Sequence, residues 1–175
     1  MLCRREMYRV RPASRSDLHL IPALERAATK RYGGAGIAKV YDSLCMTAEQ
    51  VEGRQHRGRL WVAVDRDEKP VGFATWSVLD GLAHLDELDV HPAHGRQGIG
   101  SRLIGVVCQW ARERGRRGIT LSTATGVAWT VPFYQGQGFR VLPEPAYTDG
   151  LRRLRAAEAA AGLPMTLRLI MHRHV

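Results

Sequence analysis

Three consecutive strand-like runs in the middle of the chain constrain the fold more than any other feature. The runs are LWVAV (60–64), VGFATWSV (71–78) and LAHLDELDV (82–90), and short polar turns separate them. Runs rich in β-branched and aromatic residues are typical of strands, and connections this short allow neighbouring strands to pair only in an antiparallel way. The third run ends at His91-Pro92, because proline cannot donate to a strand ladder. The sequence therefore predicts an antiparallel three-stranded meander.

A helix follows the meander after a glycine-rich loop. Residues 99–114 place apolar side chains at helical spacing, at Leu103, Val106, Val107 and Trp110. The strand-like run ITLST (119–123) comes directly after this helix. A strand that follows a crossover helix usually lies parallel to its neighbour, so we expect one parallel pair in the sheet.

The remaining segments add helices and strands on both sides of this centre. The expected elements are a strand at 8–11, a helix capped by Ser14 or Ser16 and running to Lys30, a break at 31–36, a helix opened by a Thr47–Gln50 capping box, a short helix near 128–136, a strand at 139–142, a helix at 150–161 and a strand at 166–172. This order predicts an α/β (mixed α+β) fold, with a mostly antiparallel sheet of about six or seven strands and helices on both faces. No linker interrupts residues 1–175, so we expect one domain with an ordered core at about 8–172.

Composition and charge restrict the classes of protein. Of the 175 residues, 45% are hydrophobic and 25% charged, which supports a globular core and argues against disorder. The formal net charge is +9, with 23 arginines and 3 lysines, and such a surplus attracts phosphates of a cofactor or of nucleic acid. The three cysteines are far apart and no HExxH or Cys/His cluster occurs, so we expect neither disulfides nor a metal. The chain also lacks a secretory signal and a long apolar run, which indicates a cytoplasmic protein without a membrane anchor.

The glycine-rich loop GRQGIGS (95–101) has the composition of a phosphate seat. It leads from the end of a strand into a helix, whose first N–H groups and positive dipole end attract anions. Two well-known phosphate loops do not match it. Ser101 stands where the Walker A motif requires lysine, and Leu103 stands where the dinucleotide fingerprint requires its third glycine.

The loop resembles the pyrophosphate loop of the GCN5-related N-acetyltransferase (GNAT) family, Gln/Arg-x-x-Gly-x-Gly/Ala. Gly98 and Gly100 match it, while Gly95 replaces the usual Gln/Arg and Arg96 follows. A second motif, Tyr134 with Gly138-Phe139, is similar to the family's Tyr-x-x-x-Gly-Phe. The resemblance covers nearly the whole chain, because the order of the elements also corresponds.

The resemblance implies acetyl-CoA as co-substrate and a set of residues that bind it. The backbone amides of Leu88 and Val90 are expected to pair with the pantetheine arm, and Tyr134 to lie near the sulfur. The diphosphate is expected to contact the loop and its neighbours, namely Arg96, Gln97, Gly98, Gly100, Ser101 and, less directly, Arg102. The family often binds the pantetheine arm through an asparagine, and this chain contains none. Either Thr125 or Thr130 replaces it, or the contact is absent.

The run His84–Val90 supplies the candidate general bases. From the family pattern we rank Asp86 first, Glu87 second and His84 third, with Tyr134 as the proton donor to the thiolate. Strict alternation along a strand puts His84 and Asp86 on one face and Glu87 and Asp89 on the other. In the family this strand bulges and separates from the next strand, so we expect the alternation to shift near Leu88.

These features predict an acetyl-CoA-dependent N-acetyltransferase, in which a primary amine attacks the thioester directly in a ternary complex. Two alternatives stay open: a basic nucleic-acid-binding protein, which the net charge alone supports, and a non-catalytic acyl-CoA sensor on the same fold. The acceptor, either a small molecule or a peptide amine, is not identified. The segment 145–164 is expected to wall its pocket or to form a homodimer interface.

Overall fold

A computed structural model describes residues 7–32, 40 and 43–175. These residues form a seven-stranded sheet with strand order β1-β2-β3-β4-β5-β7-β6. The strands are β1 (Arg9–Pro12), β2 (Leu60–Val64), β3 (Pro70–Leu79), β4 (Leu82–Val90), β5 (Gly118–Ala124), β6 (Arg140–Val141) and β7 (Arg168–His174). The α-helices are α1 (Ile21–Thr29), α3 (Ala48–His56), α4 (Ile99–Glu113), α5 (Thr130–Gly136) and α6 (Asp149–Ala160). The predicted fold class is confirmed, with seven strands.

The sheet is antiparallel except where β4 meets β5. These two strands pair in parallel through only three residue pairs, from Ala83 with Ile119 to Leu85 with Leu121. Beyond Leu85, β4 continues to Val90 while paired only with β3, so the two parallel strands separate. The predicted separation of the strand at 82–90 from the strand at 119–123 is therefore confirmed, and it opens the sheet at its centre.

A β-bulge changes the direction of the side chains on β4. Thr75 of β3 pairs with Glu87 and Trp76 pairs with Leu85, which leaves Asp86 as the extra residue. Because of this extra residue, His84 and Glu87 lie on the same face of the sheet, and Asp89 follows them. The expected bulge in this strand is confirmed, but its predicted position near Leu88 was wrong. The shift occurs at Asp86 and gathers the acidic side chains on one face.

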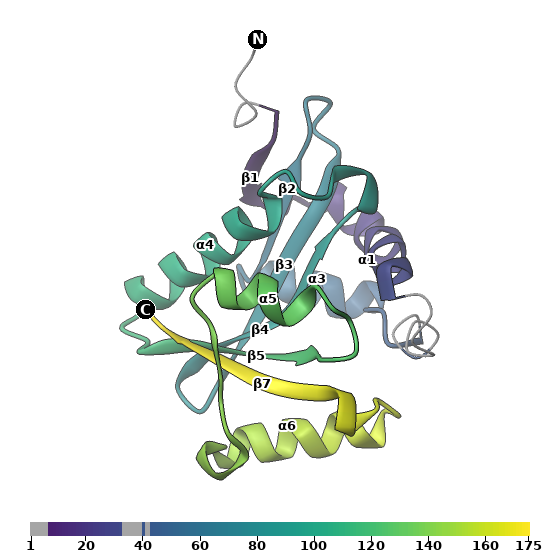
Figure 1. Cartoon of the computed structure of the whole chain (residues 1–175). Helices are drawn as coiled ribbons and strands as arrows, with labels where there is room; N and C mark the ends of the chain where they lie inside the picture. The colour runs from purple at the N-terminus through teal and green to yellow at the C-terminus, as the bar shows by residue number, and fades with distance from the viewer. Residues whose placement is uncertain (1–6, 33–39, 41–42) are drawn as a thin grey trace.

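Helices cover both faces of the sheet, as Figure 1 shows. Helices α4 and α5 lie on one face, where the buried side chains of α4 pack against Trp76 and Leu85. Helices α1 and α3 lie on the other face, where Ile21 and Val51 pack against Phe73. Helix α6 runs beside β7 (Figure 1). None of the helices in the described part of the chain has the length and apolar character needed to cross a bilayer.

Three element boundaries differ from the sequence prediction. The first helix starts as a 3₁₀ segment at 15–20 and becomes α-helical only at Ile21, because Pro22 fits the first turn of an α-helix but not its interior. Strand β6 has only two residues, and the last strand begins at Arg168 after a 3₁₀ turn. The predicted break at 31–36 lies outside the described residues from position 33 onward.

The predicted helix caps agree with the structure. The N–H of Thr47 donates to Gln50 Oε1 at 2.8 Å, and the N–H of Gln50 donates to Thr47 Oγ1 at 3.3 Å. At the first helix, Ser14 donates from its N–H and its hydroxyl to the carboxylate of Asp17, at 2.7 and 2.6 Å. Of the two predicted capping serines, Ser14 is therefore the one at the cap position.

Two glycine-to-alanine substitutions are expected to change stability in opposite directions. A Cβ at Gly118 would lie 2.8 Å from the carbonyl oxygen of Arg173 on the adjacent strand, so Gly118→Ala should lower the free energy of unfolding by about 1–3 kcal/mol. A Cβ at Gly105, on the exposed side of α4, meets nothing within 4 Å. Gly105→Ala should therefore raise stability by about 0.5–1 kcal/mol through helix propensity. Urea unfolding measures both, and two changes of the same sign would contradict the packing described for β5 and β7.

Candidate functional site

A groove of about 510 Å³ lies where the glycine-rich loop, β4 and α5 meet. Its lining combines backbone of the loop with aromatic side chains of α5 and the end of β4. The lining residues are Arg31, Leu88, Val90, His94, Gly95, Arg96, Gly98, Ile99, Gly100, Ser101, Trp129, Thr130, Pro132, Phe133 and Tyr134. The structure thus brings together most of the residues that the sequence predicts for cofactor binding. We call this cavity the loop groove.

The backbone of the loop presents amide groups to the groove. Gly98 is the N-cap of α4, and its left-handed φ of 75° favours glycine. The first N–H bonded to this cap is that of Arg102, which donates to the Gly98 carbonyl at 3.1 Å. The N–H groups of Ile99, Gly100 and Ser101 therefore have no acceptor inside the helix. Together with the helix dipole they form a seat for an anion.

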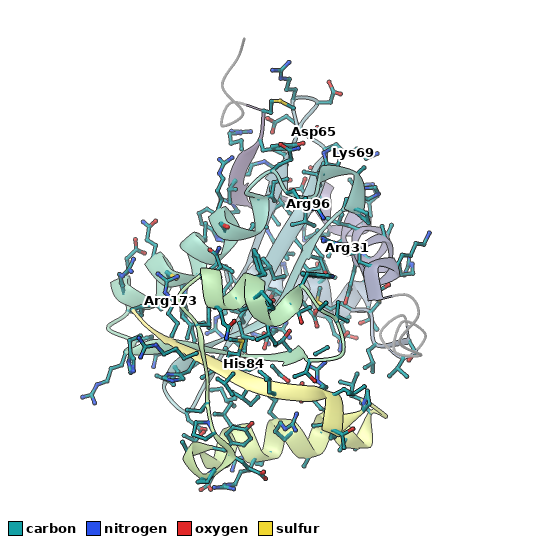
Figure 2. The ribbon with its side chains drawn as sticks, viewed as in Figure 1. Arg31, Asp65, Lys69, His84, Arg96 and Arg173 are labelled. Atoms are coloured by element: carbon teal, nitrogen blue, oxygen red, sulfur yellow. The ribbon has the colours of Figure 1, made fainter. Side chains whose placement is uncertain are left out.

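Arginine side chains add positive charge to the same groove. Arg96 lies in the loop with a left-handed φ of 59°, and Arg31 reaches the groove from the end of the first helix (Figure 2). The guanidinium carbon of Arg31 lies 4.4 Å from the centre of the Trp129 ring, which orients the side chain by a cation–π contact. Gly100 allows close packing, since a Cβ there would lie 3.0 Å from the Phe133 ring. The groove fits a polyphosphate with an apolar extension.

The exposed edge of β4 lies at the inner end of the groove. The N–H of His91 donates to the Val71 carbonyl of β3 at 2.8 Å. N–H groups alternate in direction along an extended strand, so those of Leu88 and Val90 point away from β3, toward the opening beside β5. An extended ligand can therefore pair with β4 there as an added strand.

A second cavity of about 320 Å³ lies on the other side of this opening. Its lining comes from α1, β4, β5 and α6. The residues are Glu25, Thr29, Leu44, His84, Leu85, Asp86, Glu87, Leu88, Asp89, Leu121, Ser122, Thr123, Ala124, Tyr134, Leu154, Ala157, Glu158, Ala161, Leu163 and Arg168. Leu88 and Tyr134 line both cavities, so the two cavities meet between β4 and β5. We call the second cavity the acidic pocket.

Tyr134 stands at the junction of the two cavities. It lies on α5 with its ring edge-on to Phe133 and Phe139, at centroid distances of 5.1 and 5.8 Å. The N–H of Phe139 donates to the Tyr134 carbonyl at 3.0 Å, where the helix gives way to the following strand. The glycine-phenylalanine part of the predicted motif therefore fixes the position of the tyrosine by backbone and ring contacts.

Asp86, the first-ranked candidate base, is held by two other side chains. Arg54 of α3 forms an ion pair with its carboxylate, and the hydroxyl of Ser77 donates to it at 2.9 Å. Both carboxylate oxygens of Asp86 are therefore engaged by neighbouring side chains. The contacts of Asp86 thus favour a role in holding α3 against the sheet.

His84, the third-ranked candidate, lies deep in the acidic pocket (Figure 2). It is only 4% exposed, and its Nδ1 lies 2.9 Å from Thr120 Oγ1. Burial lowers the pKa of this imidazole, so the ring is neutral at physiological pH. The Thr120 contact fixes its orientation.

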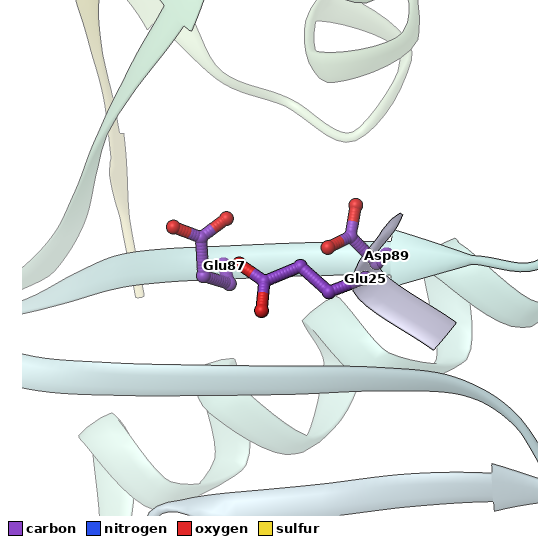
Figure 3. A group of neighbouring side chains, drawn as sticks. All are labelled: Glu25, Glu87 and Asp89. Carbon is purple, nitrogen blue, oxygen red and sulfur yellow. The ribbon is translucent and has the colours of Figure 1, made fainter. Parts of the chain in front are cut away.

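Three carboxyl groups gather at the α1 side of the acidic pocket. One oxygen each of Glu25, Glu87 and Asp89 lies within 4.8 Å of the others, a spacing that would also suit a cation (Figure 3). Burial, followed by repulsion from Glu25, raises the pKa of Asp89 to about 8. Burial and repulsion from Asp89 raise the pKa of Glu87, and burial raises the pKa of Glu25. We call these residues the acidic triad.

Some predicted cofactor residues do not line the loop groove. Gln97 and Thr125 are absent from its lining, and Arg102 donates to the Tyr8 carbonyl at 2.8 Å. Thr130 does line the groove, and its hydroxyl donates to the carbonyl oxygens of Ala124 and Val127. Of the two threonines proposed to replace the family's asparagine, Thr130 is the one that reaches the groove.

Two residues of the site were missed by sequence reasoning. Glu25 lies between Ile21 and Ala28 on the buried face of α1, and a charged residue on the apolar face of an amphipathic helix is a signal that was present in the sequence. Arg31 gave no such signal, because its place in the loop groove depends on contact with Trp129, which is distant in the sequence.

Comparison with known proteins identifies the kind of fold. A model of the Acetyltransferase (GNAT) family matches residues 21–139. The uncharacterized N-acetyltransferase YjcF of Bacillus subtilis is 31% identical over 101 residues, which cover 58% of this chain and 69% of YjcF. N-acetyltransferase family 8 member 3 of Mus musculus is 33% identical over 105 residues, so that 57% of this chain matches 46% of the mouse protein.

A solved structure agrees with this comparison. The PaiA N-acetyltransferase of Thermoplasma acidophilum, in complex with coenzyme A, superposes with a TM-score of 0.74 at 19% identity, and the match covers 96% of this chain and 99% of that protein. At this level of identity the likeness shows a shared fold.

The anion seat predicts a selective loss of affinity. Gly98→Asp introduces a side chain at a left-handed φ and a negative charge beside the amides of the loop, so it should weaken acetyl-CoA binding by about 2–3 kcal/mol, roughly a hundredfold. Isothermal titration calorimetry measures this loss. Gly58→Asp is the matched control, because Gly58 also has a positive φ, of 65°, with nothing near its Cβ, and does not line the groove. Equal affinity in the two variants would contradict the assignment of the seat.

The acidic triad predicts how stability depends on pH. Because the pKa of Asp89 is raised to about 8 in the folded protein, between about pH 4 and pH 8 the folded state holds a proton that the unfolded chain has released. The free energy of unfolding should therefore fall as the pH rises through this window. Asp89→Asn removes this titration, so the fall should be shallower in urea unfolding, whereas Asp67→Asn, at an exposed turn, should keep the wild-type slope. An unchanged slope for Asp89→Asn would contradict the buried position of this carboxyl.

Proposed function

Because the chain belongs to the acetyltransferase (GNAT) family, we propose that it transfers the acetyl group of acetyl-CoA to a primary amine that attacks the thioester directly in a ternary complex. One observation carries this proposal: the loop groove and the acidic pocket meet at Leu88 and Tyr134, where β4 separates from β5. A cofactor in the groove and an amine in the pocket can then react without a covalent enzyme intermediate.

The loop groove suits coenzyme A in both charge and shape. The amides of Ile99, Gly100 and Ser101 are available for the diphosphate, and Arg31 and Arg96 supply positive charge. The edge of β4 at Leu88 and Val90 is available for the amide groups of the pantetheine arm. The coenzyme A in the PaiA structure supports this proposal.

Glu87 is our candidate general base. It lines the acidic pocket beside the junction, and no ion pair holds its carboxyl among the described residues, in contrast to Asp86. Its raised pKa makes the carboxylate a stronger proton acceptor than an ordinary glutamate. Glu87 would remove the proton of the incoming ammonium group, directly or through a water molecule.

Two further groups complete the reaction. Bound acetyl-CoA supplies the acyl carbon and a thiolate leaving group. The N–H of Leu88 points toward the opening, where it would donate to the carbonyl oxygen as negative charge develops. Tyr134 lines both cavities, so its hydroxyl would give a proton to the departing sulfur.

The test is acetyl-CoA turnover with a panel of amines, measured as release of free CoA. Release that depends on the amine distinguishes an enzyme from a sensor that only binds acyl-CoA. Acetyl-CoA binding without release for any amine would instead support the sensor.

Variants of the proposed base and acid should lower the rate and leave cofactor binding intact. Glu87→Gln and Tyr134→Phe should each reduce kcat about 10²- to 10⁴-fold while the affinity for acetyl-CoA stays within about twofold. In the wild type, kcat/KM should rise with pH as Glu87 ionises, and Glu87→Gln should remove that rise. A larger decrease in kcat for Asp86→Asn than for Glu87→Gln would instead indicate that Asp86 is the base.

A further inference from the structure

The acidic pocket holds more carboxyl groups than the proposed reaction needs. One base is enough to deprotonate an amine, and Glu87 fills that role in the proposed function. One carboxyl oxygen each of Glu25 and Asp89 lies within 4.8 Å of a Glu87 oxygen, and the proposed reaction does not use these two groups. Figure 3 shows Glu87 and Asp89 projecting from the same side of β4, with the carboxyl group of Glu25 reaching toward Glu87 from α1.

These surplus carboxyls lack the partners that other acids of the pocket have. Asp86 pairs with Arg54, and Glu158 pairs with Arg168 at 2.8 Å. Asp89 is 9% exposed and lines the pocket, yet among the described residues no hydrogen bond or ion pair reaches its carboxyl. Glu25 accepts the N–H of Met46 at 2.9 Å, and no ion pair of its carboxyl occurs among the described residues. Arg31 acts on Asp89 and Arg26 acts on Glu25 only electrostatically, without an ion pair. A buried carboxyl without a directly bound cation is costly, so the pocket suits a ligand that carries positive charge.

A second polar group beside the triad also lacks a partner. Thr75 lies directly opposite Glu87 on β3 and on the same face of the sheet. It is fully buried, and its Oγ1 has no hydrogen-bond partner among the described residues. This unsatisfied hydroxyl is a second polar group, independent of the carboxyls, on the face of the sheet that carries Glu87.

The acidic pocket is opposite in charge to the chain as a whole. The protein has a formal net charge of +9, and arginines line the loop groove. In the acidic pocket, by contrast, five acidic residues face one arginine, Arg168. A field of this sign concentrates cations and repels ligands that carry a carboxylate near the reacting amine.

The wall of the pocket at α6 is mostly apolar. Helix α6 contributes Leu154, Ala157 and the Arg168-paired Glu158, and Ala161 and Leu163 follow the helix. The predicted role of segment 145–164 as a wall of the acceptor pocket fits this lining. The apolar side chains of this wall suit the methylene groups of an aliphatic chain.

We propose, resting on the proposed function, that the acceptor is an aliphatic diamine or longer polyamine. Its reacting amino group lies at Glu87, and a second, non-reacting ammonium group is held by Glu25 and Asp89. An ammonium group has three N–H donors, which match a seat made of converging carboxylates. The methylene chain lies against the wall formed by α6.

The experiment compares two amines with the same carbon chain, putrescine with two amino groups and n-butylamine with one. For the wild type, kcat/KM should be at least about tenfold higher with putrescine, which corresponds to one charge-assisted contact. Because Glu25 and Asp89 also raise the pKa of Glu87, which acts on either amine, the readout is the ratio of kcat/KM for putrescine to kcat/KM for butylamine. Glu25→Gln and Asp89→Asn should each raise KM for putrescine and lower this ratio about tenfold. Glu113→Gln, at an exposed position on α4, is the matched control and should change neither.

The outcomes separate this inference from the proposed function. Turnover of both amines with equal kcat/KM would overturn the diamine seat and leave acetyl transfer intact. A loss for butylamine as large as that for putrescine in the Glu25→Gln and Asp89→Asn variants would overturn the diamine seat too, provided that neither variant melts at a lower temperature than the wild type. If no amine is turned over, acetyl transfer is wrong, whereas putrescine binding measured by calorimetry and weakened in both variants would still support the seat. If the preference for putrescine over butylamine disappears when EDTA is added and returns when Mg²⁺ is added, the acidic triad binds a metal ion instead of an ammonium group.

Discussion

The separation of β4 from β5 is the constraint on which the rest of the site depends. The two strands share three residue pairs, and after Leu85 none of the described strands pairs with β4 on the β5 side. Backbone N–H groups that would otherwise complete a sheet are therefore available to a ligand. The same opening joins the loop groove to the acidic pocket, so two ligands can meet through the sheet while each stays in its own cavity.

The bulge at Asp86 determines which side chains face each cavity. Without it, alternation would send Glu87 and Asp89 to the face of α4 and α5, away from His84. With it, the acidic side chains face the pocket and Leu88 and Val90 face the groove. One extra residue in β4 thus places its acidic side chains toward the acidic pocket and its apolar side chains toward the loop groove.

Local signals in the sequence were enough to predict most of the fold and the cofactor groove. The meander, the amphipathic helix after the glycine-rich loop and the Thr47–Gln50 cap are each encoded within a few neighbouring residues, and each was confirmed. The position of the bulge was not predictable in this way, because it depends on the pairing of β4 with β3. The ion pair of Asp86 with Arg54 depends likewise on how α3 packs against the sheet. Glu25 is the intermediate case, since its place on an apolar helix face was visible but its partners on β4 were not.

The two cavities carry opposite charge, and this difference has a consequence for the proposed ternary complex. The groove offers amides and arginines to an anionic cofactor, while the pocket offers carboxyls to a cationic amine. If both ligands entered by one cavity, each would neutralise the field that attracts the other. Separate cavities of opposite sign let each ligand be attracted independently, and the charges come together only at Leu88 and Tyr134, where the reaction requires them. The formal net charge of +9 therefore agrees in sign with the loop groove but not with the acidic pocket.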